Sequence, residues 1–98
     1  MVKGTIETRD GVHRIECRGH ATGSEQVCAA ISALMYALIG FLGNQPDLED
    51  VIYECKIESG HSLVAFKGYD EAFDVVRIGL LQLANSYPEY LKITENEG

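Results

Sequence analysis

A histidine and a cysteine lie eight positions apart, and the segment between them begins with the small residues Ala21-Thr22-Gly23. His20 lies in a predicted loop, and Cys28 falls in the first turns of a predicted helix. Backbone N–H groups at the start of a helix carry partial positive charge, which stabilises a thiolate. A neighbouring imidazole can carry the proton, and free N–H groups can hold the oxyanion that forms when a thiolate attacks a peptide carbonyl. The pair therefore predicts the chemistry of a Cys/His hydrolase.

Two further polar side chains fall on the same side of the predicted helix as Cys28. Glu25 lies three positions before the cysteine and Ser32 four positions after it, so each is one helical turn away. Glu25 can orient His20 or hold a substrate amine, and Ser32 can bond to the thiol or to the helix backbone. Structural roles are the alternatives: free cysteines are often buried for packing, Glu25 suits the first turn of any helix, and Ser32 makes room at a helix contact.

A zinc site is the other chemistry that these residue types suggest. Cys17 and His20 have the spacing C-x-x-H, and His61 lies farther along the chain. A zinc signature is specific when two such pairs are present, and a second matching pair is missing from the sequence. We therefore expect no metal and no cofactor, and we expect Cys17 and Cys55 to be core thiols.

The elements that position these residues alternate between strands and helices. Asp10-Gly11 between two β-like runs predicts an opening hairpin, Ser24 is a good N-cap for the first helix, and Asp70 is expected to cap the second, which ends before Pro88. The predicted elements are strands at 2–8 and 12–18, a helix at 25–42, strands at 51–59 and 62–67, a helix at 70–87 and a strand at 90–94. An acidic linker is expected at 47–50 and a frayed tail at 95–98. The order ββαββαβ predicts one α+β domain over residues 1–98, with two helices on one sheet.

The first predicted helix is apolar almost all round. From Val27 to Leu42 only Ser32, Tyr36 and Gly40 interrupt the apolar run, so we expect the helix at the buried centre of the molecule. The run of sixteen residues is shorter than the roughly 20 that a transmembrane helix needs, which argues against a membrane partner. A second subunit could cover the apolar excess, so the helix also favours a homodimer.

Net charge and cysteine content limit the classes of binding partner and the cellular compartment that we expect. Fifteen acidic and eight basic side chains give the 98-residue chain a formal charge of −7. This charge repels phosphate backbones and anionic lipids, which argues against direct nucleic-acid binding, and it attracts a basic partner. Three cysteines without a C-x-x-C pair, and no secretory N-terminal region, favour the reducing cytoplasm.

Three segments of the chain form a specific combination: Gly19-His20-Ala21, the helical string Val27-Cys28-Ala29-Ala30-Ile31-Ser32-Ala33-Leu34 and the segment Tyr87-Pro88-Glu89-Tyr90. Together they resemble the bacterial ribosomal-processing cysteine protease family called Prp. The likeness spans nearly the whole chain and implies the family's α+β fold. It also implies that Cys28 is the nucleophile and His20 its base. Glu25 then stands where the family usually has aspartate, and Ser32 is the helix serine near the thiol.

The resemblance also implies a substrate and an assembly. The family removes a short N-terminal extension from large-subunit ribosomal protein twenty-seven, a basic protein that suits an acidic protease, and its members are typically homodimers. The segment between the histidine and the cysteine is shorter here than the usual family loop, which orders over substrate. We expect the substrate loop to include Gly19, Ala21, Thr22 and Gly23. The alternative function is a non-catalytic dimeric binding module for a basic ribosomal or phage-type partner.

Overall fold

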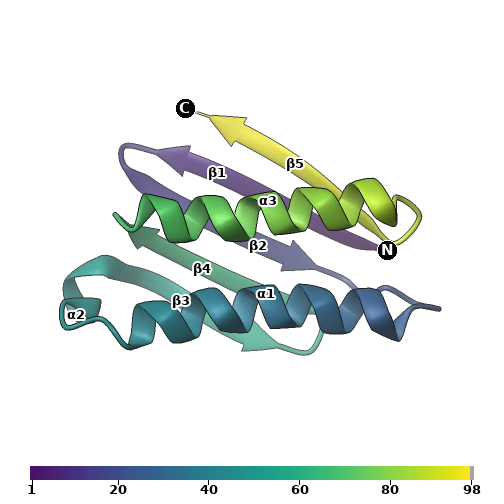
Figure 1. Cartoon of the computed structure of the whole chain (residues 1–98), viewed down its shortest axis with the longest axis horizontal. Helices are drawn as coiled ribbons and strands as arrows, with labels where there is room; N and C mark the ends of the chain where they lie inside the picture. The colour runs from purple at the N-terminus through teal and green to yellow at the C-terminus, as the bar shows by residue number, and fades with distance from the viewer. Residues whose placement is uncertain (98) are drawn as a thin grey trace.

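Two long helices lie on one face of a five-stranded sheet in the computed structural model, which describes residues 1–97 (Figure 1). The elements are β1 (Val2–Arg9), β2 (Val12–Arg18), α1 (Glu25–Gly43), α2 (Leu48–Val51), β3 (Ile52–Glu58), β4 (His61–Lys67), α3 (Asp70–Ser86) and β5 (Leu91–Glu97). The predicted order ββαββαβ is confirmed, with one addition. The stretch expected to be an acidic linker forms the short helix α2.

The sheet has the strand order β3-β4-β2-β1-β5. Strands β1 and β2, β2 and β4, and β3 and β4 pair antiparallel, whereas β1 and β5 pair in parallel. The opening hairpin is confirmed, and its turn has positive φ at Asp10 (53°) and Gly11 (79°), as a two-residue hairpin of type I′ requires. On its other side β2 pairs with β4, with Arg18 opposite His61, which brings the end of β2 close to the β3–β4 turn.

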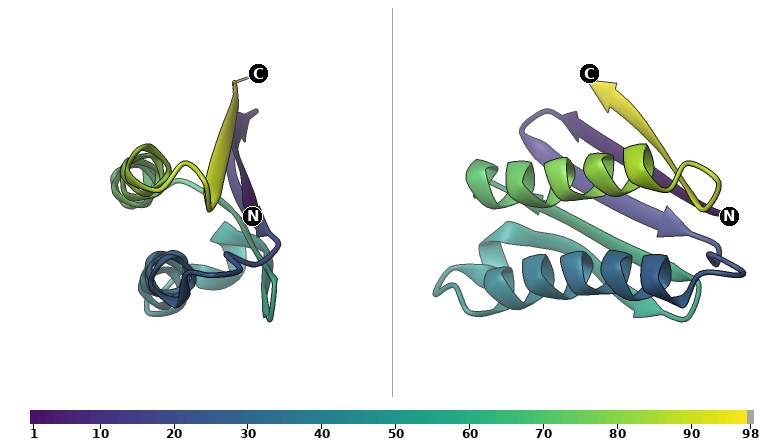
Figure 2. Two further views of the ribbon diagram at one scale, coloured as in Figure 1. Left: turned by 90° about the vertical axis from the view of Figure 1, so that its right-hand side faces the viewer. Right: turned by 45° about the vertical axis from the view of Figure 1, so that its right-hand side comes forward.

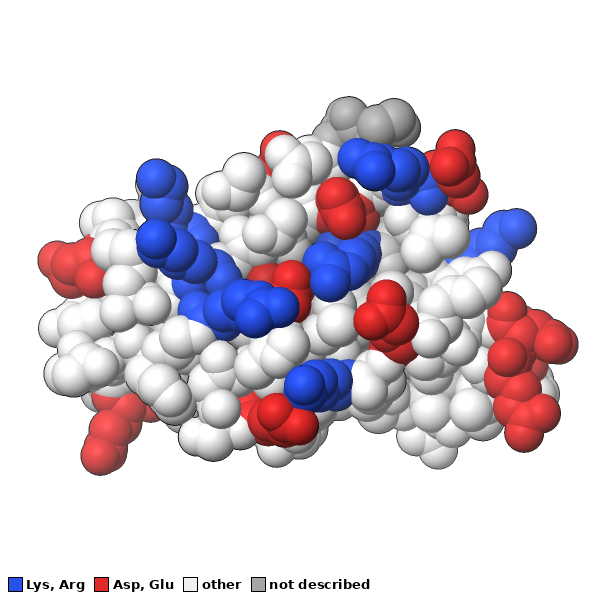
Figure 3. Space-filling view, turned by 180° about the vertical axis from the view of Figure 1, so that it is seen from behind, with Lys and Arg blue, Asp and Glu red and all other residues white. Residues whose placement is uncertain are grey.

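The core lies between the sheet and the helical layer, and the opposite sheet face is open (Figure 2). Along β2, alternate residues His13, Ile15 and Cys17 are buried toward the helices. The intervening residues face away from the helices. Lys and Arg side chains gather on that open face with Asp and Glu among them (Figure 3). The molecule is therefore a two-layer structure with a single core and one polar sheet face.

Helix α1 lies in the outer layer rather than at the buried centre, so that prediction is wrong. Only one side of the helix is buried, through Val27, Ile31, Met35, Leu38 and Leu42. Its 19 residues exceed the apolar run seen in the sequence, and by length and composition alone the helix could cross a membrane. Length and composition are weak evidence, because helices packed in a protein core pass the same test. Here a continuous stripe of α1 packs on the sheet.

Strand β3 is confirmed, but its predicted half-burial is wrong. It is an edge strand, and every residue from Tyr53 to Glu58 is exposed. Cys55 is therefore an exposed thiol and not the core thiol that was expected. By contrast, Leu63 to Phe66 of β4 are all buried, as predicted. Val64 and Phe66 belong to the core, whereas Leu63 and Ala65 lie on the open face, flanked by side chains of β2 and β3.

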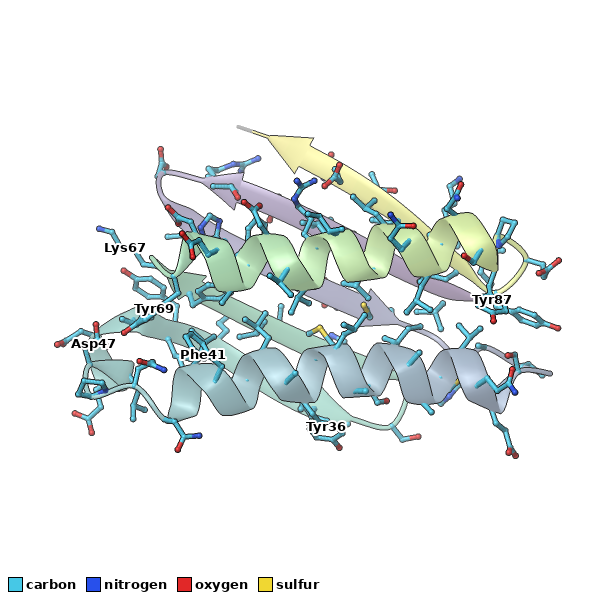
Figure 4. All side chains as sticks on the ribbon, viewed as in Figure 1. Tyr36, Phe41, Asp47, Lys67, Tyr69 and Tyr87 are labelled. Atoms are coloured by element: carbon cyan, nitrogen blue, oxygen red, sulfur yellow. The ribbon has the colours of Figure 1, made fainter. Side chains whose placement is uncertain are left out.

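The start of α3 also differs from the prediction. The N-cap is Tyr69, whose backbone is left-handed (φ 50°), and Asp70 is the first helical residue. The exposed Asp70 side chain bonds to β2 instead, with its Oδ1 2.7 Å from Nε2 of the buried His13. The Tyr69 hydroxyl donates to Asp47 at 2.6 Å, and the Tyr69 ring meets Phe41 edge-on, which joins the two helices (Figure 4).

The C-terminal strand is longer than expected. Strand β5 continues to Glu97 along β1, so the predicted tail is mostly ordered strand. Gly98, the last residue of the predicted tail, lies outside the described residues. Parallel pairing with β1 supplies the hydrogen bonds that a polar tail would otherwise take from water.

Candidate active site

The site begins where β2 ends and the chain turns into α1. Gly19 has φ +103°, and a Cβ there would come within 2.5 Å of the Met1 carbonyl oxygen, so only glycine fits. His20 follows directly. Ser24 then caps α1, and its Oγ accepts the Val27 N–H at 3.3 Å. A short loop thus carries the histidine into the helix that carries the cysteine.

The Cys28 sulfur receives a backbone hydrogen bond from this loop. The N–H of Ala21, the residue after the histidine, donates to Cys28 Sγ at 3.2 Å. Ala21 is buried, and its carbonyl accepts the N–H of Ser24 at 2.9 Å, so the loop is held as a closed turn. The turn therefore holds this N–H in place beside the sulfur, and Cys28 itself is half-buried and lines two pockets.

Two pockets flank Cys28. One, of about 320 Å³, lies between the first half of α1 and the β3–β4 turn, and Cys28 lines it together with Cys17, Gly19, His20, Ser32, Tyr36, Ile57, Glu58, Gly60 and His61. The other, of about 530 Å³, follows the loop and is lined by Ala21, Thr22, Gly23, Ser24, Glu25 and Cys28. The structure therefore places the predicted nucleophile and base in one pocket. Cys28 also forms part of the second.

The supporting residues predicted from the sequence divide between these pockets. Ser32 is exposed and lines the pocket that holds His20, whereas Glu25 is exposed and lines the other one. Within residues 1–97, neither a Glu25–His20 nor a Ser32–Cys28 hydrogen bond is formed. The roles proposed for these two side chains stay predictions.

His61, which the sequence suggested only as a possible metal ligand, also lines the pocket, but its side chain lies on the open sheet face with those of Arg18 and Glu16. His61 begins β4, and its Nε2 lies 2.6 Å from Oε2 of Glu16 on β2. Burial raises the pKa of Glu16, but the hydrogen bonds from His61 and Arg18 and the charges of Arg14 and Arg18 outweigh it and hold the pKa below its usual range. Glu16 is thus an anchor for the histidine. The register of β2 against β4 brings His61 and Glu16 together, and this register could not be predicted from the sequence.

The three thiols have different environments. Cys17 lines the same pocket but is 4% exposed, and burial raises its pKa to about 11, so at neutral pH it is a protonated thiol. Cys55 is exposed on β3 and lies outside both pockets. Only Cys28 combines partial exposure, a backbone donor to sulfur and a histidine in the same pocket.

A metal centre does not form from these residues. Although Cys17, His20 and His61 line one pocket, the described part of the chain contains no group of three His, Cys, Asp or Glu side chains arranged to hold an ion.

The C-terminal segment of the sequence motif supports the loop from outside. Gly23 has φ +94°, and a Cβ there would lie 3.7 Å from the Tyr90 ring. The Tyr90 carbonyl accepts the Val2 N–H at 2.8 Å, so the tyrosine is tied to the sheet. Segments that are far apart in the sequence thus meet around the loop between His20 and Cys28.

Comparison with known proteins identifies the family. A sequence model described as cysteine protease Prp matches residues 1–92. The chain belongs to the cysteine protease Prp family. No curated protein sequence matches it. The match runs from the start of the chain to the start of β5, so it includes the loop that carries His20 and the helix that carries Cys28.

Solved structures show the same fold. The essential ribosomal processing protease Prp of Staphylococcus aureus, in complex with a covalently linked product peptide, matches with a TM-score of 0.76 and 20% identity, over 98% of this chain and 100% of that chain. The same protease with a substrate peptide gives a TM-score of 0.72 and 19% identity, over 98% and 100%. The Streptococcus mutans protein SMU.848 gives 0.72 and 24%, over 100% of this chain and 96% of that chain. The Prp-like fold therefore extends over the whole chain.

Proposed function

We propose that this chain is a cysteine endopeptidase with Cys28 as nucleophile and His20 as its proton carrier. The observation that supports this most is the Ala21 N–H on Cys28 Sγ at 3.2 Å, in a pocket that His20 also lines. The thiolate is the nucleophilic form of cysteine, and the Ala21 N–H is placed to donate a hydrogen bond to it. The family of the chain is that of a cysteine protease, which agrees with this chemistry.

The proposed reaction uses only protein groups and water. Cys28 transfers its proton to His20, and the thiolate attacks the scissile carbonyl carbon. Because Val27 and Cys28 donate their N–H groups to Ser24, the N–H groups of Glu25 and Gln26 at the start of α1 are those left to face an oxyanion. The C–N bond breaks as His20 protonates the leaving amine. His20 then takes a proton from water, which hydrolyses the thioester and releases Cys28.

We propose that the substrate is a basic N-terminal segment of a ribosomal protein, namely the extension of large-subunit protein twenty-seven. The fold relative from Staphylococcus aureus is described as a ribosomal processing protease. On this chain an acidic side chain lies in each of the pockets that flank Cys28, Glu58 in one and Glu25 in the other. Most basic side chains lie instead on the open sheet face: Lys3, Arg14, Arg18, Lys56 and Lys92 (Figure 3). A cationic peptide is therefore attracted toward Cys28.

A cleavage assay tests this function. A synthetic peptide with the basic extension and the first residues of the mature protein is incubated with wild type, Cys28→Ala, His20→Ala and Cys55→Ser, and the products are identified by mass spectrometry. We expect wild type and Cys55→Ser to cleave at one bond and the other two variants to be inactive. Equal cleavage by Cys28→Ala would refute the proposal. Binding of the peptide without cleavage by wild type would favour the non-catalytic module instead.

We also propose a cytoplasmic homodimer. Helices α1 and α3 expose large apolar side chains on the outer side of the molecule, among them Tyr36 (59% exposed) and Val75 (68%). Tyr36 projects from α1 away from α3 (Figure 4). A second copy that covers such side chains would remove apolar surface from water. Light scattering should give twice the chain mass, and a monomer at every concentration would contradict the dimer. Free thiols at all three cysteines suit a reducing compartment.

A further inference from the structure

The imidazole of His20 lies directly over a glycine in the turn between β3 and β4. A Cβ built on Gly60 would come within 2.6 Å of His20 Nε2 and 2.9 Å of Cε1. Real Cβ atoms do not approach other atoms this closely, so any side chain at this position must displace the imidazole. The turn and the histidine come from different elements, β3–β4 and the β2–α1 loop. Their contact is therefore a tertiary feature.

The same glycine also holds the backbone that carries the histidine. The Gly60 carbonyl accepts the N–H of Gly19 at 2.9 Å, and Gly19 is the residue before His20. On its other side Gly19 packs against the Met1 carbonyl. The backbone entering His20 is thus fixed between the N-terminus and the β3–β4 turn. The imidazole of His20 occupies the space that a side chain at position 60 would fill.

We propose that Gly60 is a positioning residue that sets where the His20 imidazole stands relative to Cys28. This inference rests on the proposed function, because it assigns Gly60 a role in the proton transfer between these two residues. The backbone carbonyl of Gly60 fixes the main chain before His20. The missing side chain leaves the room that the ring occupies in the pocket shared with Cys28.

A side chain at position 60 would displace the His20 ring and would leave the core residues in place. The atoms that a Cβ would meet are all at the far end of the His20 side chain, and His20 is exposed, so the ring can swing into solvent. The Gly60 carbonyl and its bond to Gly19 are kept in an alanine variant. Gly60→Ala is therefore expected to move the imidazole while the fold remains.

The chain offers a matched control. Gly60 has φ +75°, so alanine there also strains the backbone. Gly68 has φ +80°, follows β4 and has no atom within 4 Å of its Cβ position. Gly68→Ala carries the same backbone strain without touching His20. The difference between the two variants reports the displacement of the imidazole.

The test measures Cys28 directly as well as cleavage. Iodoacetamide labelling is followed for each cysteine by peptide-resolved mass spectrometry from pH 5 to 9, in wild type, Gly60→Ala, Gly68→Ala, His20→Ala and the double variant Gly60→Ala with His20→Ala. We expect the pH profile of Cys28 in Gly60→Ala to move to that of His20→Ala, and Gly68→Ala to match wild type. The double variant should equal His20→Ala, because the ring that Gly60→Ala displaces is already gone.

Measuring peptide cleavage by the same variants distinguishes a failure of this inference from a failure of the proposed function. A misplacement of about 1 Å can cost about 100-fold in rate, so we expect kcat of Gly60→Ala to fall by about that factor below that of Gly68→Ala, with KM little changed. If both glycine variants cleave and label alike, Gly60 has no positioning role, although the protease assignment stands. If wild type cleaves nothing but the labelling contrast holds, the positioning role stands and the proposed function fails.

Discussion

Replacing Glu16 with glutamine removes a charge on which three basic side chains converge. The Glu16 side chain is 12% exposed, and its carboxylate lies 2.6 Å from His61, 2.9 Å from Arg18 and 3.2 Å from Arg14. Glutamine keeps the size and one acceptor but loses the charge. Because the Glu16–His61 contact joins β2 to the first residue of β4, the change tests how the sheet holds the β3–β4 turn that borders the site.

The loss of unfolding free energy that we expect for Glu16→Gln is larger at neutral pH than at acidic pH. The pKa of Glu16 is lowered from its ordinary value of 4.5 in the folded protein. Its stabilising effect is therefore fully present above pH 4.5 and is lost as the pH falls through the folded pKa. Hydrogen bonds to a charged group contribute about 1.5–3 kcal/mol. We expect Glu16→Gln to lower the free energy of unfolding by about 2 kcal/mol at pH 7, and by much less at pH 3.

Urea unfolding followed by far-UV circular dichroism measures both values. Glu54→Gln is the matched control, because Glu54 is exposed on the same sheet face and forms no ion pair within residues 1–97. The control should change the free energy of unfolding by less than about 0.5 kcal/mol at either pH. A Glu16→Gln effect that is the same at pH 7 and pH 3, or no larger than that of the control, would refute the reasoning.

Three shorter predictions follow from burial and capping. Burial raises the pKa of Cys17 to about 11, so its thiolate fraction at pH 7 is about 10⁻⁴ and it should resist iodoacetamide, whereas the exposed Cys55 should be labelled. Similar labelling rates of the two cysteines, measured by mass spectrometry, would contradict this. Ser24→Ala removes the N-cap of α1 and should cost about 1 kcal/mol in urea unfolding, and an unchanged midpoint would speak against the cap. Leu38→Ala removes a side chain that is 1% exposed and should cost about 2–5 kcal/mol by the same method, and a cost below 1 kcal/mol would show that α1 is not packed as described.

Local sequence rules were sufficient for most of the element order. The Asp10-Gly11 turn and the Ser24 cap each depend on a few neighbouring residues, and both are where the sequence predicts them. The start of α3 is different. Asp70 has the right type for an N-cap, but a tertiary bond to His13 uses its carboxylate, and Tyr69 takes the cap position instead.

Burial was harder to predict than secondary structure, because it depends on where an element lies in the sheet. Strand β3 alternates apolar and polar residues like a half-buried strand, yet its edge position leaves Cys55 exposed. Helix α1 has too many apolar residues for its single buried stripe. Periodicity within a segment does not show which face another element will cover.

The candidate site was predictable only where its parts are close in sequence. His20 and Cys28 are joined by one short loop, so their type and spacing could be recognised. Gly60 is brought to His20, and Glu16 to His61, through the pairing of β2 with β4 and of β3 with β4. These contacts are long-range and have no local signature, which explains why both emerged only from the structure.

The central claim is that Cys28 forms a covalent thioester with its substrate during cleavage. Single-turnover reactions with the basic peptide, quenched in acid and digested, can show by mass spectrometry which residue carries the acyl group. The account predicts an adduct of the substrate's N-terminal part on Cys28, present in wild type and in Cys55→Ser and absent in Cys28→Ala. Cleavage with no adduct on Cys28, or with the acyl group on another residue, would contradict it.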